Sequence, residues 1–344
     1  MSKINTSILW GIILLILGFS ACTCSTGQAI QKVLGSSAET PVFLGVKALS
    51  SKKILFEFSK PITVSSINFD PPLEIQSISD GTSSEEASVL VSLKEAIRGG
   101  ERIVADLLVE DELGNTLGVL IPFRSRNEQI PDLIITELRT EYANPKAEFL
   151  EIKTLSPGNL GAIRLFIAGT GMAEPIFEFP PTEVASGEYM VLHLRTLDPA
   201  SVNETGEDIG LSAGTETFPD ARDFWVPEAL KRLRKTDVIL LLDQDNKVLD
   251  GVLLSEKPDN TWAKEDLSRG ADMLTAQKAW LPAEKEERNL SPRDAVLTKG
   301  ATATRTICRD ETAPDTNTAA DWYIAATSQA SPGKPNSGKR YEPK

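Results

Sequence analysis

Short apolar runs separated by turn residues are the feature that most limits what this chain can fold into. In the first half of the chain these runs are bounded by turn signals such as Asp70-Pro71-Pro72 and Gly114-Asn115. Seven strands at this spacing are typical of an antiparallel β-sandwich. The predicted strands are Val42–Leu49, Ile54–Phe58, Ile62–Phe69, Leu73–Ile78, Val89–Leu93, Ile103–Val109 and Leu117–Phe123.

A second set of strands follows the polar, proline-containing segment Arg126–Pro131, which has the composition of a domain boundary. The stretch Pro131–Leu165 alternates strand and turn, with strand cores at Leu133–Leu138 and Glu148–Lys153. We therefore expect an all-β protein made of two β-sandwich domains. The predicted parts are a first domain at 41–126, a second at 131–337 with partly helical insertions at about 198–237 and 255–300, and a polar tail at 338–344.

Composition and charge narrow the class of protein. The 344 residues are 41% hydrophobic and 25% charged, which is typical of a globular chain. The formal net charge is -13, with a sequence pI near 4.8. Duplex nucleic acid binding requires a basic surface, so we expect no nucleic acid partner.

The N-terminus has the layout of an export signal. Residues 1–21 carry Lys3, an apolar run at Ile8–Phe19 and small residues before Cys22. The run is shorter than the roughly 20 residues that a membrane-spanning helix needs. The tetrapeptide Phe19-Ser20-Ala21-Cys22 resembles the lipobox of bacterial lipoproteins. An uncleaved signal anchor is the alternative.

The lipobox resemblance implies cleavage between Ala21 and Cys22, lipidation of Cys22, and attachment to a membrane by acyl chains. Residues 22–40 are rich in Ser, Gly, Ala and Gln and are expected to form a flexible tether. Thr23, rather than an aspartate, follows the lipid site. This favours the outer membrane or cell surface as the location within the cell envelope.

Two phrases in the first domain resemble bacterial Ig-like modules. KILFEFSKPI at Lys53–Ile62 is similar to their second strand, and DELGNTLGVLIPF at Asp111–Phe123 is similar to their closing hairpin. The resemblance implies a spacer without chemistry of its own.

The second domain resembles the lamin tail domain over Asp132–Asn336, with interruptions. Six phrases carry the resemblance, and the last is the most specific. They are ITEL at Ile135–Leu138, EFLEI at Glu148–Ile152, NLGAIRL at Asn159–Leu165, FEFPPTEVASGEYMVLHL at Phe177–Leu194, LLDQDNKVLDGVLL at Leu241–Leu254 and, within Thr304–Asn336, TRTICRD and DTNTAADWYIAATSQASPGKPN. The family has an aromatic residue where this chain has Ala162-Ile163. The resemblance implies an Ig-like β-sandwich.

The two insertions are the candidate partner surface, since variable loops on a rigid sandwich commonly carry recognition. In the first, a short helix is predicted to begin at Trp225-Val226-Pro227, with Leu230 and Leu233 facing inward. Its basic residues would then face outward, toward lipid phosphate, an acidic partner or solvent. They are Lys231, Arg232, Arg234 and Lys235.

The second insertion contains Trp262, Trp280 and a predicted helix at Ala271–Trp280. The two tryptophans either complete a hydrophobic core or bind a ligand such as a sugar.

The sequence contains few residues suited to nucleophilic or metal-dependent catalysis. His193 is the chain's only histidine, and no G-x-S-x-G elbow accompanies it, so a strand histidine with internal partners is favoured over a catalytic triad. Cys308 is predicted to be a buried, unreactive thiol. The chain lacks the Cys/His ligands of zinc sites and has no phosphate-binding or dinucleotide-binding loop. We expect neither a cofactor nor a metal.

Several carboxylates lie within or beside the predicted strands of the second domain. Glu137 alternates onto the strand face of Leu133 and Ile135, which predicts a partly buried structural acid. Glu148 and Glu151 are predicted to point to opposite faces, each accepting backbone or Arg hydrogen bonds. Calcium binding by Asp243, Asp245 and Asp250 stays open beside a simple hairpin turn.

The function predicted from these features is a non-catalytic, lipid-anchored envelope protein that acts as an interaction or scaffolding module. The alternatives are an accessory or binding subunit of an envelope hydrolase of nuclease or phosphatase type, and a carbohydrate- or ligand-binding surface protein. A hydrolase that uses Glu137 or His193 is the enzymatic alternative.

Overall fold

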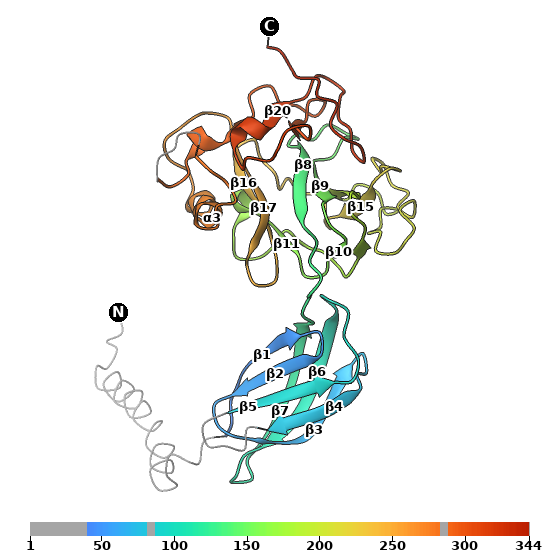
Figure 1. The fold of residues 1–344 in the computed structure, drawn as a ribbon, viewed down its shortest axis with the longest axis vertical. Helices are drawn as coiled ribbons and strands as arrows, with labels where there is room; N and C mark the ends of the chain where they lie inside the picture. The colour runs from blue at the N-terminus through green and yellow to red at the C-terminus, as the bar shows by residue number, and fades with distance from the viewer. Residues whose placement is uncertain (1–39, 81–86, 283–287, 344) are drawn as a thin grey trace, which may run out of the picture. The chain divides into compact units, whose positions relative to one another are not determined.

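The computed structural model describes residues 40–80, 87–282 and 288–343. As predicted, the protein is all-β, with a single α-helix among the described residues (Figure 1). None of the helices in these ranges is both long and apolar enough to span a membrane. The predicted leader, the lipidation site Cys22 and the tether lie outside the described residues.

The chain forms two compact units. The first contains the segment that ends at Lys47 together with Lys53–Lys94 and Val104–Phe123, and the second contains Ala48–Lys52, Glu95–Ile103 and Arg124–Lys344. Each unit is built from sheets whose buried residues face a core of that unit.

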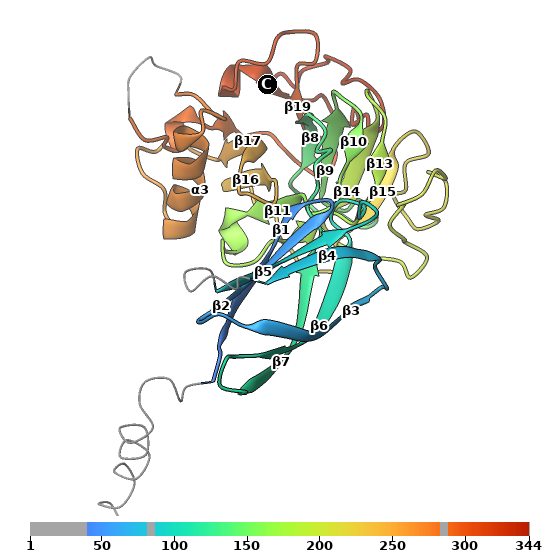
Figure 2. The ribbon, with the colours of Figure 1, turned by 60° about the horizontal axis from the view of Figure 1, so that its bottom comes forward.

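The first unit is a sandwich of two antiparallel sheets, in the strand orders β1-β2-β5-β4 and β3-β6-β7 (Figures 1 and 2). Side chains alternate between the two faces of these strands, most clearly in β2, where Ile54, Phe56 and Phe58 are all buried. Each of the seven predicted strands is present. The strands are β1 (Phe43–Ser50), β2 (Lys53–Phe58), β3 (Thr63–Asp70), β4 (Ile75–Asp80), β5 (Ser88–Leu93), β6 (Arg102–Glu110) and β7 (Thr116–Arg124).

The second unit packs a six-stranded sheet, in the order β15-β14-β9-β8-β19-β20, against a five-stranded sheet, in the order β12-β11-β16-β17-β18. β10 (Gly158–Asn159) and β13 (Glu183–Val184) form a separate two-stranded sheet. The six-stranded sheet contains β8 (Leu133–Arg139), β9 (Phe149–Thr154), β14 (Tyr189–His193), β15 (Arg222–Trp225), β19 (Ile307–Arg309) and β20 (Trp322–Ile324). The five-stranded sheet contains β11 (Arg164–Ile167), β12 (Phe177–Glu178), β16 (Asp237–Leu242), β17 (Val248–Ser255) and β18 (Val296–Leu297).

Strands β16 and β17 are apolar runs because both of their faces are covered. The six-stranded sheet covers one face, and the helix α3 (Glu265–Ala276) lies against the other (Figure 2). The core of the second unit is one continuous cluster that includes Ile135, Leu150 and Leu241. Short 3-10 turns, η2 (Ala168–Thr170), η3 (Pro292–Asp294) and η4 (Ala319–Asp321), connect the strands.

Helix α3 begins six residues before the predicted helix at Ala271–Trp280 and ends four residues before that helix's predicted end. It buries Leu267, Gly270, Ala271 and Leu274, the i, i+3, i+4, i+7 pattern of one helix face. A Cβ atom on Gly270 would lie 2.9 Å from Val238 Cγ1, so the glycine allows the helix to approach β16 closely. The prediction failed at the C-terminal end because Lys278 takes a left-handed φ of 57°, which ends the helix.

The helix predicted to begin at Pro227 is absent. Glu228 has a φ of 72°, which no α-helix tolerates, and the chain from 227 to 236 is irregular. Leu233 is buried as predicted, but Leu230 is 58% exposed rather than facing inward. The arginine at 232 instead donates to the backbone carbonyls of Pro227 and Leu194, so tertiary contacts replace helical hydrogen bonds.

Both insertions also contribute strands. Within residues 198–237, β15 runs parallel to β14 and forms one edge of the six-stranded sheet. Within 255–300, β18 pairs in parallel with β17. The segments are therefore part of the sandwich as well as loops upon it.

Candidate functional site

A β-bulge on β8 brings two glutamates together. Ile135 pairs with Ile152 and Glu137 pairs with Glu151, so Thr136 is an extra residue in β8. Beyond the bulge Leu138, not Glu137, joins Leu133 and Ile135 in the core. The prediction that Glu137 shares a face with Leu133 and Ile135 is therefore wrong, because the bulge shifts the alternation by one residue.

Glu137 and Glu151 are both fully buried. The Ser331 N–H donates to Glu137 Oε2 at 3.0 Å, and the Cys308 thiol lies 3.6 Å from Glu137 Oε1. Glu151 accepts the Thr136 hydroxyl at 2.7 Å and the Gly333 N–H at 2.7 Å. Burial raises the pKa of both carboxyls, and the charge of Glu137 raises that of Glu151 further.

Glu311 completes a carboxylate cluster, which we define as Glu137, Glu151 and Glu311. Its Oε2 accepts from Lys153 Nζ at 2.8 Å and from the Tyr189 hydroxyl at 2.7 Å. Its Oε1 accepts the Asn336 N–H at 2.9 Å. Burial, followed by the hydrogen bond to Glu311, raises the pKa of the Tyr189 phenol. Glu311 thereby joins the sheet to the chain's C-terminal segment.

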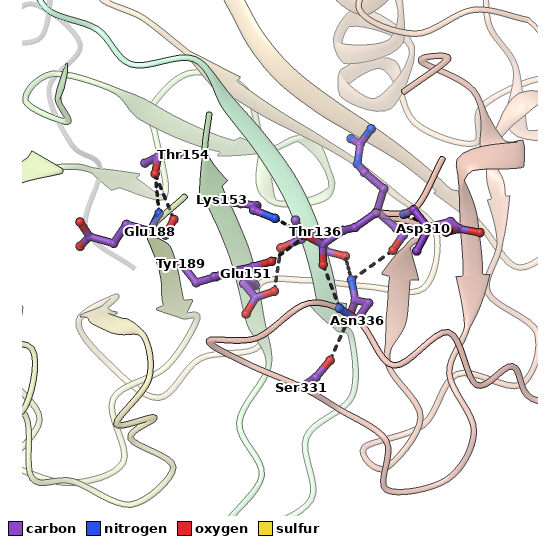
Figure 3. Close-up of polar contacts among 12 residues, drawn as sticks. Thr136, Glu151, Lys153, Thr154, Glu188, Tyr189, Asp310, Ser331 and Asn336 are labelled. Carbon is purple, nitrogen blue, oxygen red and sulfur yellow. Dashed lines mark hydrogen bonds and ion pairs between the residues drawn. The ribbon is translucent and has the colours of Figure 1, made fainter. Parts of the chain in front are cut away.

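Residues Ser331–Asn336, which we call the closing loop, supply one backbone N–H to each of the three glutamates, through Ser331, Gly333 and Asn336. The Asn336 side chain also donates to the carbonyls of Thr136 at 2.9 Å and Arg309 at 3.2 Å (Figure 3). Buried carboxyl groups require hydrogen-bond partners, and here the backbone of the closing loop supplies them. This arrangement fixes a loop to a sheet.

Cys308 lies beside the carboxylate cluster, on β19 opposite Glu137. It is a buried free cysteine, and burial raises the pKa of its thiol. A thiol in this setting stays protonated, which makes it a poor nucleophile.

Another buried acid, Asp250, ties the two large sheets together. Asp250 on β17 accepts the Ile135 N–H at 2.6 Å and pairs with Arg309 Nη2 at 2.9 Å. Burial raises the Asp250 pKa to about 6. Asp243, by contrast, accepts the N–H groups of Asp245 and Lys247 in the hairpin turn.

Each calcium candidate therefore has a partner within the protein. Asp243 accepts hydrogen bonds in the turn, Asp245 pairs with Arg126 at the surface, and Asp250 forms the buried pair with Arg309. In the ranges that the structure describes, no group of three or more His, Cys, Asp or Glu residues could hold a metal ion.

His193 is enclosed by an acid and two aromatic rings. Its Nε2 lies 2.8 Å from Asp223 Oδ1, and its ring stacks 3.7 Å from the Trp225 ring and 5.6 Å from the Phe218 ring. The other Asp223 oxygen accepts the Phe218 N–H. Burial lowers the His193 pKa, which keeps the imidazole neutral. The pair anchors the first insertion to β14 and is buried at 1% exposure for both side chains.

Glu148 lies just before β9 and forms a buried bidentate pair with Arg195, both contacts being 2.5 Å. The Arg195 guanidinium also lies 4.2 Å from the centroid of the Tyr142 ring. Glu148 and Glu151 therefore have separate internal partners.

The predicted partner surface is largely built into the fold. Trp280 is 1% exposed and donates to the Asp294 carbonyl at 2.9 Å, so its assignment to a partner surface is wrong. Trp262 is half-buried against the core and donates to the Leu290 carbonyl at 3.0 Å. Both rings complete the core because α3 and the chain after it wrap over β16 and β17.

The four basic residues predicted to face outward make contacts within the protein. Arg234 donates to the Gly169 carbonyl at 2.7 Å, and Lys231 and Lys235 lie 3.7 and 3.9 Å from Glu141. Burial lowers the Arg232 pKa. Lys231 is the most exposed of the ion-paired residues in this cluster, at 49% of its side chain. The four basic residues therefore do not form a single phosphate-binding surface.

Comparison with known proteins identifies the family of the second unit. A family model described as "TP_1001_2nd: protein second domain" matches residues 131–324, which is more than half of the chain. The chain belongs to this family. The TP_1001 second-domain match includes all three members of the carboxylate cluster, whereas the closing loop lies beyond its end at residue 324.

One curated relative is an uncharacterized protein of Treponema pallidum (strain Nichols), 30% identical over 190 residues, which are 53% of this chain and 48% of the relative. The chain thus spans about half the length of the curated relative it matches. Among solved structures, the N-terminal part of the bacterial S-layer protein SbsC aligns with 66% of this chain and 46% of that chain. Its identity is 12% and its TM-score 0.26.

Sequence reasoning missed the residues that complete each buried group in this TP_1001 second-domain protein. These residues are distant in sequence from the groups they contact. Asp223 is 30 positions from His193, and Glu311 is 122 positions from Tyr189. Asn336 is 200 positions from Thr136. A signal for the last did exist in the phrase SPGKPN, whose Gly and Pro residues indicate a fixed loop. Nothing local connects that loop with the glutamates of β8 and β9.

Proposed function

We propose that this protein is a non-catalytic, lipid-anchored component of the cell envelope, whose second unit acts as a lamin-tail-type interaction or scaffolding module at the outer membrane or cell surface. The observation that supports this role most is the use of the carboxylate cluster. Each of its three glutamates accepts a hydrogen bond from the closing loop, which rigidifies the sandwich. A rigid sandwich with loops upon it suits a platform for recognition.

The membrane location rests on the leader and on Cys22. Labelling of the full chain with radioactive palmitate in a bacterial host tests it. We expect label on the wild-type protein, loss of label and release into the soluble fraction for Cys22→Ser, and no change for the matched control Cys24→Ser. Label that persists in Cys22→Ser would reject the lipid site.

The competing proposal is a hydrolase that uses Glu137 or His193. Glu137→Gln discriminates between the two roles, because Glu137 here accepts the Ser331 N–H. A structural acid predicts a lowered melting temperature. An unchanged melting temperature, together with loss of a phosphatase or nuclease activity measured for the wild type, would reject the non-catalytic role.

A further inference from the structure

Strand β20 lies at one edge of the six-stranded sheet, and residues 339–341 pair with its free side. The Tyr341 N–H donates to the Ile324 carbonyl at 2.8 Å. The Ala326 N–H donates to the Lys339 carbonyl at 2.9 Å. Part of the segment predicted to be a polar tail thus takes the place of a further strand. We call the residues that hold it the edge site, which comprises Gly300, Arg305, Asp310, Tyr323, Ile324 and Ala326.

One position of the edge site accepts a cation. The Arg340 guanidinium lies 5.0 Å from the centroid of the Tyr323 ring, and its Nη2 pairs with Asp310 Oδ2 at 3.1 Å. Hydrogen bonds from Thr312 lower the Asp310 pKa, which keeps this carboxylate charged. An aromatic face and a carboxylate both attract a guanidinium or ammonium group. The local chemistry therefore specifies a basic side chain here.

The next position accepts an aromatic ring. A Cβ atom on Gly300 would lie 2.7 Å from Tyr341 Cε1, so the glycine leaves room for the ring. The Arg305 guanidinium lies 4.1 Å from the centroid of the same ring. Arg305 Nε is buried and has no hydrogen-bond partner among the residues that the structure describes. The edge site thus fits a basic residue followed directly by an aromatic one.

Few contacts hold this segment in place. Gly338, between the closing loop and the segment, has a φ of 70° and donates its N–H to the Tyr323 hydroxyl at 3.0 Å. Lys339 and Arg340 are exposed. Exposed ion pairs contribute little stability, and segments with few buried contacts open at small cost. Pro343 has no N–H group with which to lengthen the pairing. The segment is therefore a short and weakly held occupant of the edge site.

We propose that the edge site binds an extended segment of a protein partner that carries Arg or Lys followed by Tyr or Phe, and that residues 339–341 occupy the site until such a segment displaces them. The inference rests on the proposed role as an interaction module and gives that role a site and a partner chemistry. The seated segment shows which backbone direction and which side chains fit. In strand addition, main-chain hydrogen bonds supply affinity and side-chain positions supply specificity.

Fluorescence anisotropy with a labelled peptide tests the proposal on the full chain. The probe, Ser-Gly-Lys-Arg-Tyr-Glu with an N-terminal fluorophore and a C-terminal amide, copies residues 337–342. The double variant Arg340→Ala/Tyr341→Ala removes the side chains that seat the chain's own segment. We expect it to bind the probe at least about tenfold more tightly than the wild type, whose site is open for only part of the time. The matched control Lys339→Ala changes an exposed side chain of the same segment and should bind as weakly as the wild type.

Altered peptides separate the edge site from general attraction to a chain with a formal charge of -13. Exchanging Arg and Tyr within the probe keeps its charge and should weaken binding at least about fivefold, because Arg305 would then face a cation. Replacing Tyr with Ala should weaken binding about tenfold. Adding Asp310→Asn to the double variant should weaken binding of the probe about two- to fivefold. Equal thermal melting of the variants and the wild type would show that each is folded.

Amide hydrogen exchange of the wild type tests the opening of the site without any peptide. The Tyr341 N–H is held by the edge of β20, whereas the Gly333 N–H is held by buried Glu151. We expect the Tyr341 amide to exchange at least about 100-fold faster than the Gly333 amide, after correction for intrinsic rates, because the segment opens while the closing loop stays bound.

Four results would overturn the proposal. They are no binding of the probe to the double variant at millimolar concentration, equal binding of the probe and the exchanged peptide, equal exchange of the Tyr341 and Gly333 amides, and sedimentation of the wild type as a dimer that the double variant does not form. The last would assign the edge site to a second copy of the chain. The palmitate experiment at Cys22 is independent of these outcomes, so failure of this site and failure of the proposed envelope role are distinguishable.

Discussion

Glu137 on β8 and Glu151 on β9 are paired across neighbouring antiparallel strands, and both side chains are 0% exposed. Each accepts a backbone N–H from the closing loop, 3.0 Å from Ser331 for Glu137 and 2.7 Å from Gly333 for Glu151. Burial raises the pKa values of both carboxyls, and the charge of Glu137 raises that of Glu151 further. The fold thus joins its C-terminal segment to its central strands through two buried acids.

This pairing contributes a component of stability that falls as pH rises above about 4.5. Because burial raises the pKa values of Glu137 and Glu151 above 4.5, the folded state binds more protons than the unfolded state in that window. The contribution is fully present below the unfolded pKa and is lost as pH rises through the folded pKa. Asp237 and Asp250, whose pKa values are raised to about 6 by burial, act in the same direction.

Urea unfolding between pH 4 and pH 8 measures this effect. Glu151→Gln removes one titrating group and should flatten part of the fall, at a cost of about 1–3 kcal/mol at acidic pH for the mismatched hydrogen bonds. The exposed Glu174→Gln serves as the control and should follow the wild-type slope. A Glu151→Gln curve parallel to the wild type would contradict the assignment.

Gly333 in the closing loop should not tolerate a side chain. It has a φ of 82°, and a Cβ atom there would lie 2.6 Å from the Asp220 carbonyl carbon. We expect Gly333→Ala to lower the free energy of unfolding by about 2–4 kcal/mol, from left-handed strain plus the steric clash. Gly338→Ala is a matched control, because Gly338 has a φ of 70° with nothing near its Cβ position, and should cost only about 1–2 kcal/mol. Equal losses would rule out the close approach as the cause.

Removal of Arg195 should be among the most damaging single changes. Arg195→Met leaves the Glu148 carboxylate buried without its bidentate partner, which should cost about 3–5 kcal/mol in thermal or urea unfolding. The exposed pair of Lys47 and Glu57 offers a comparison, since Lys47→Met should change stability by less than about 1 kcal/mol. Similar effects of the two variants would show that the Glu148 pair is not energetically buried.

The single histidine gives a separate pH signature. Burial lowers the His193 pKa below 6.5, so the unfolded state takes up a proton first as the solution is acidified. This component of stability is complete above pH 6.5 and is lost as pH falls below it. The imidazole proton resonance of the folded chain should therefore show no titration at pH 6.5, and a midpoint at that pH would refute the buried His193–Asp223 pair. In His193→Gln the component should vanish from the unfolding curve.

Local sequence patterns predict many of the strands in this fold. The alternation of Ile54, Phe56 and Phe58 determines β2 without any partner strand, and turn residues separate all seven strands of the first unit. The same reasoning located β8, β9 and β14, because a strand that buries one or both faces has a short apolar run. Prediction from local sequence failed where contacts with distant residues determine the backbone conformation. No helix forms after Pro227, where Arg232 binds the carbonyls of Pro227 and Leu194.

The all-β class, the run of strands and the presence of buried acids on β8 and β9 were determined by the sequence alone, through side-chain periodicity. Only the tertiary structure decided that Thr136 bulges, that Glu137 consequently faces Glu151, and that a loop nearly two hundred residues later reaches both acids. The physical reason is that a one-residue bulge reverses every later side chain of a strand, and its stability depends on partners that periodicity does not encode.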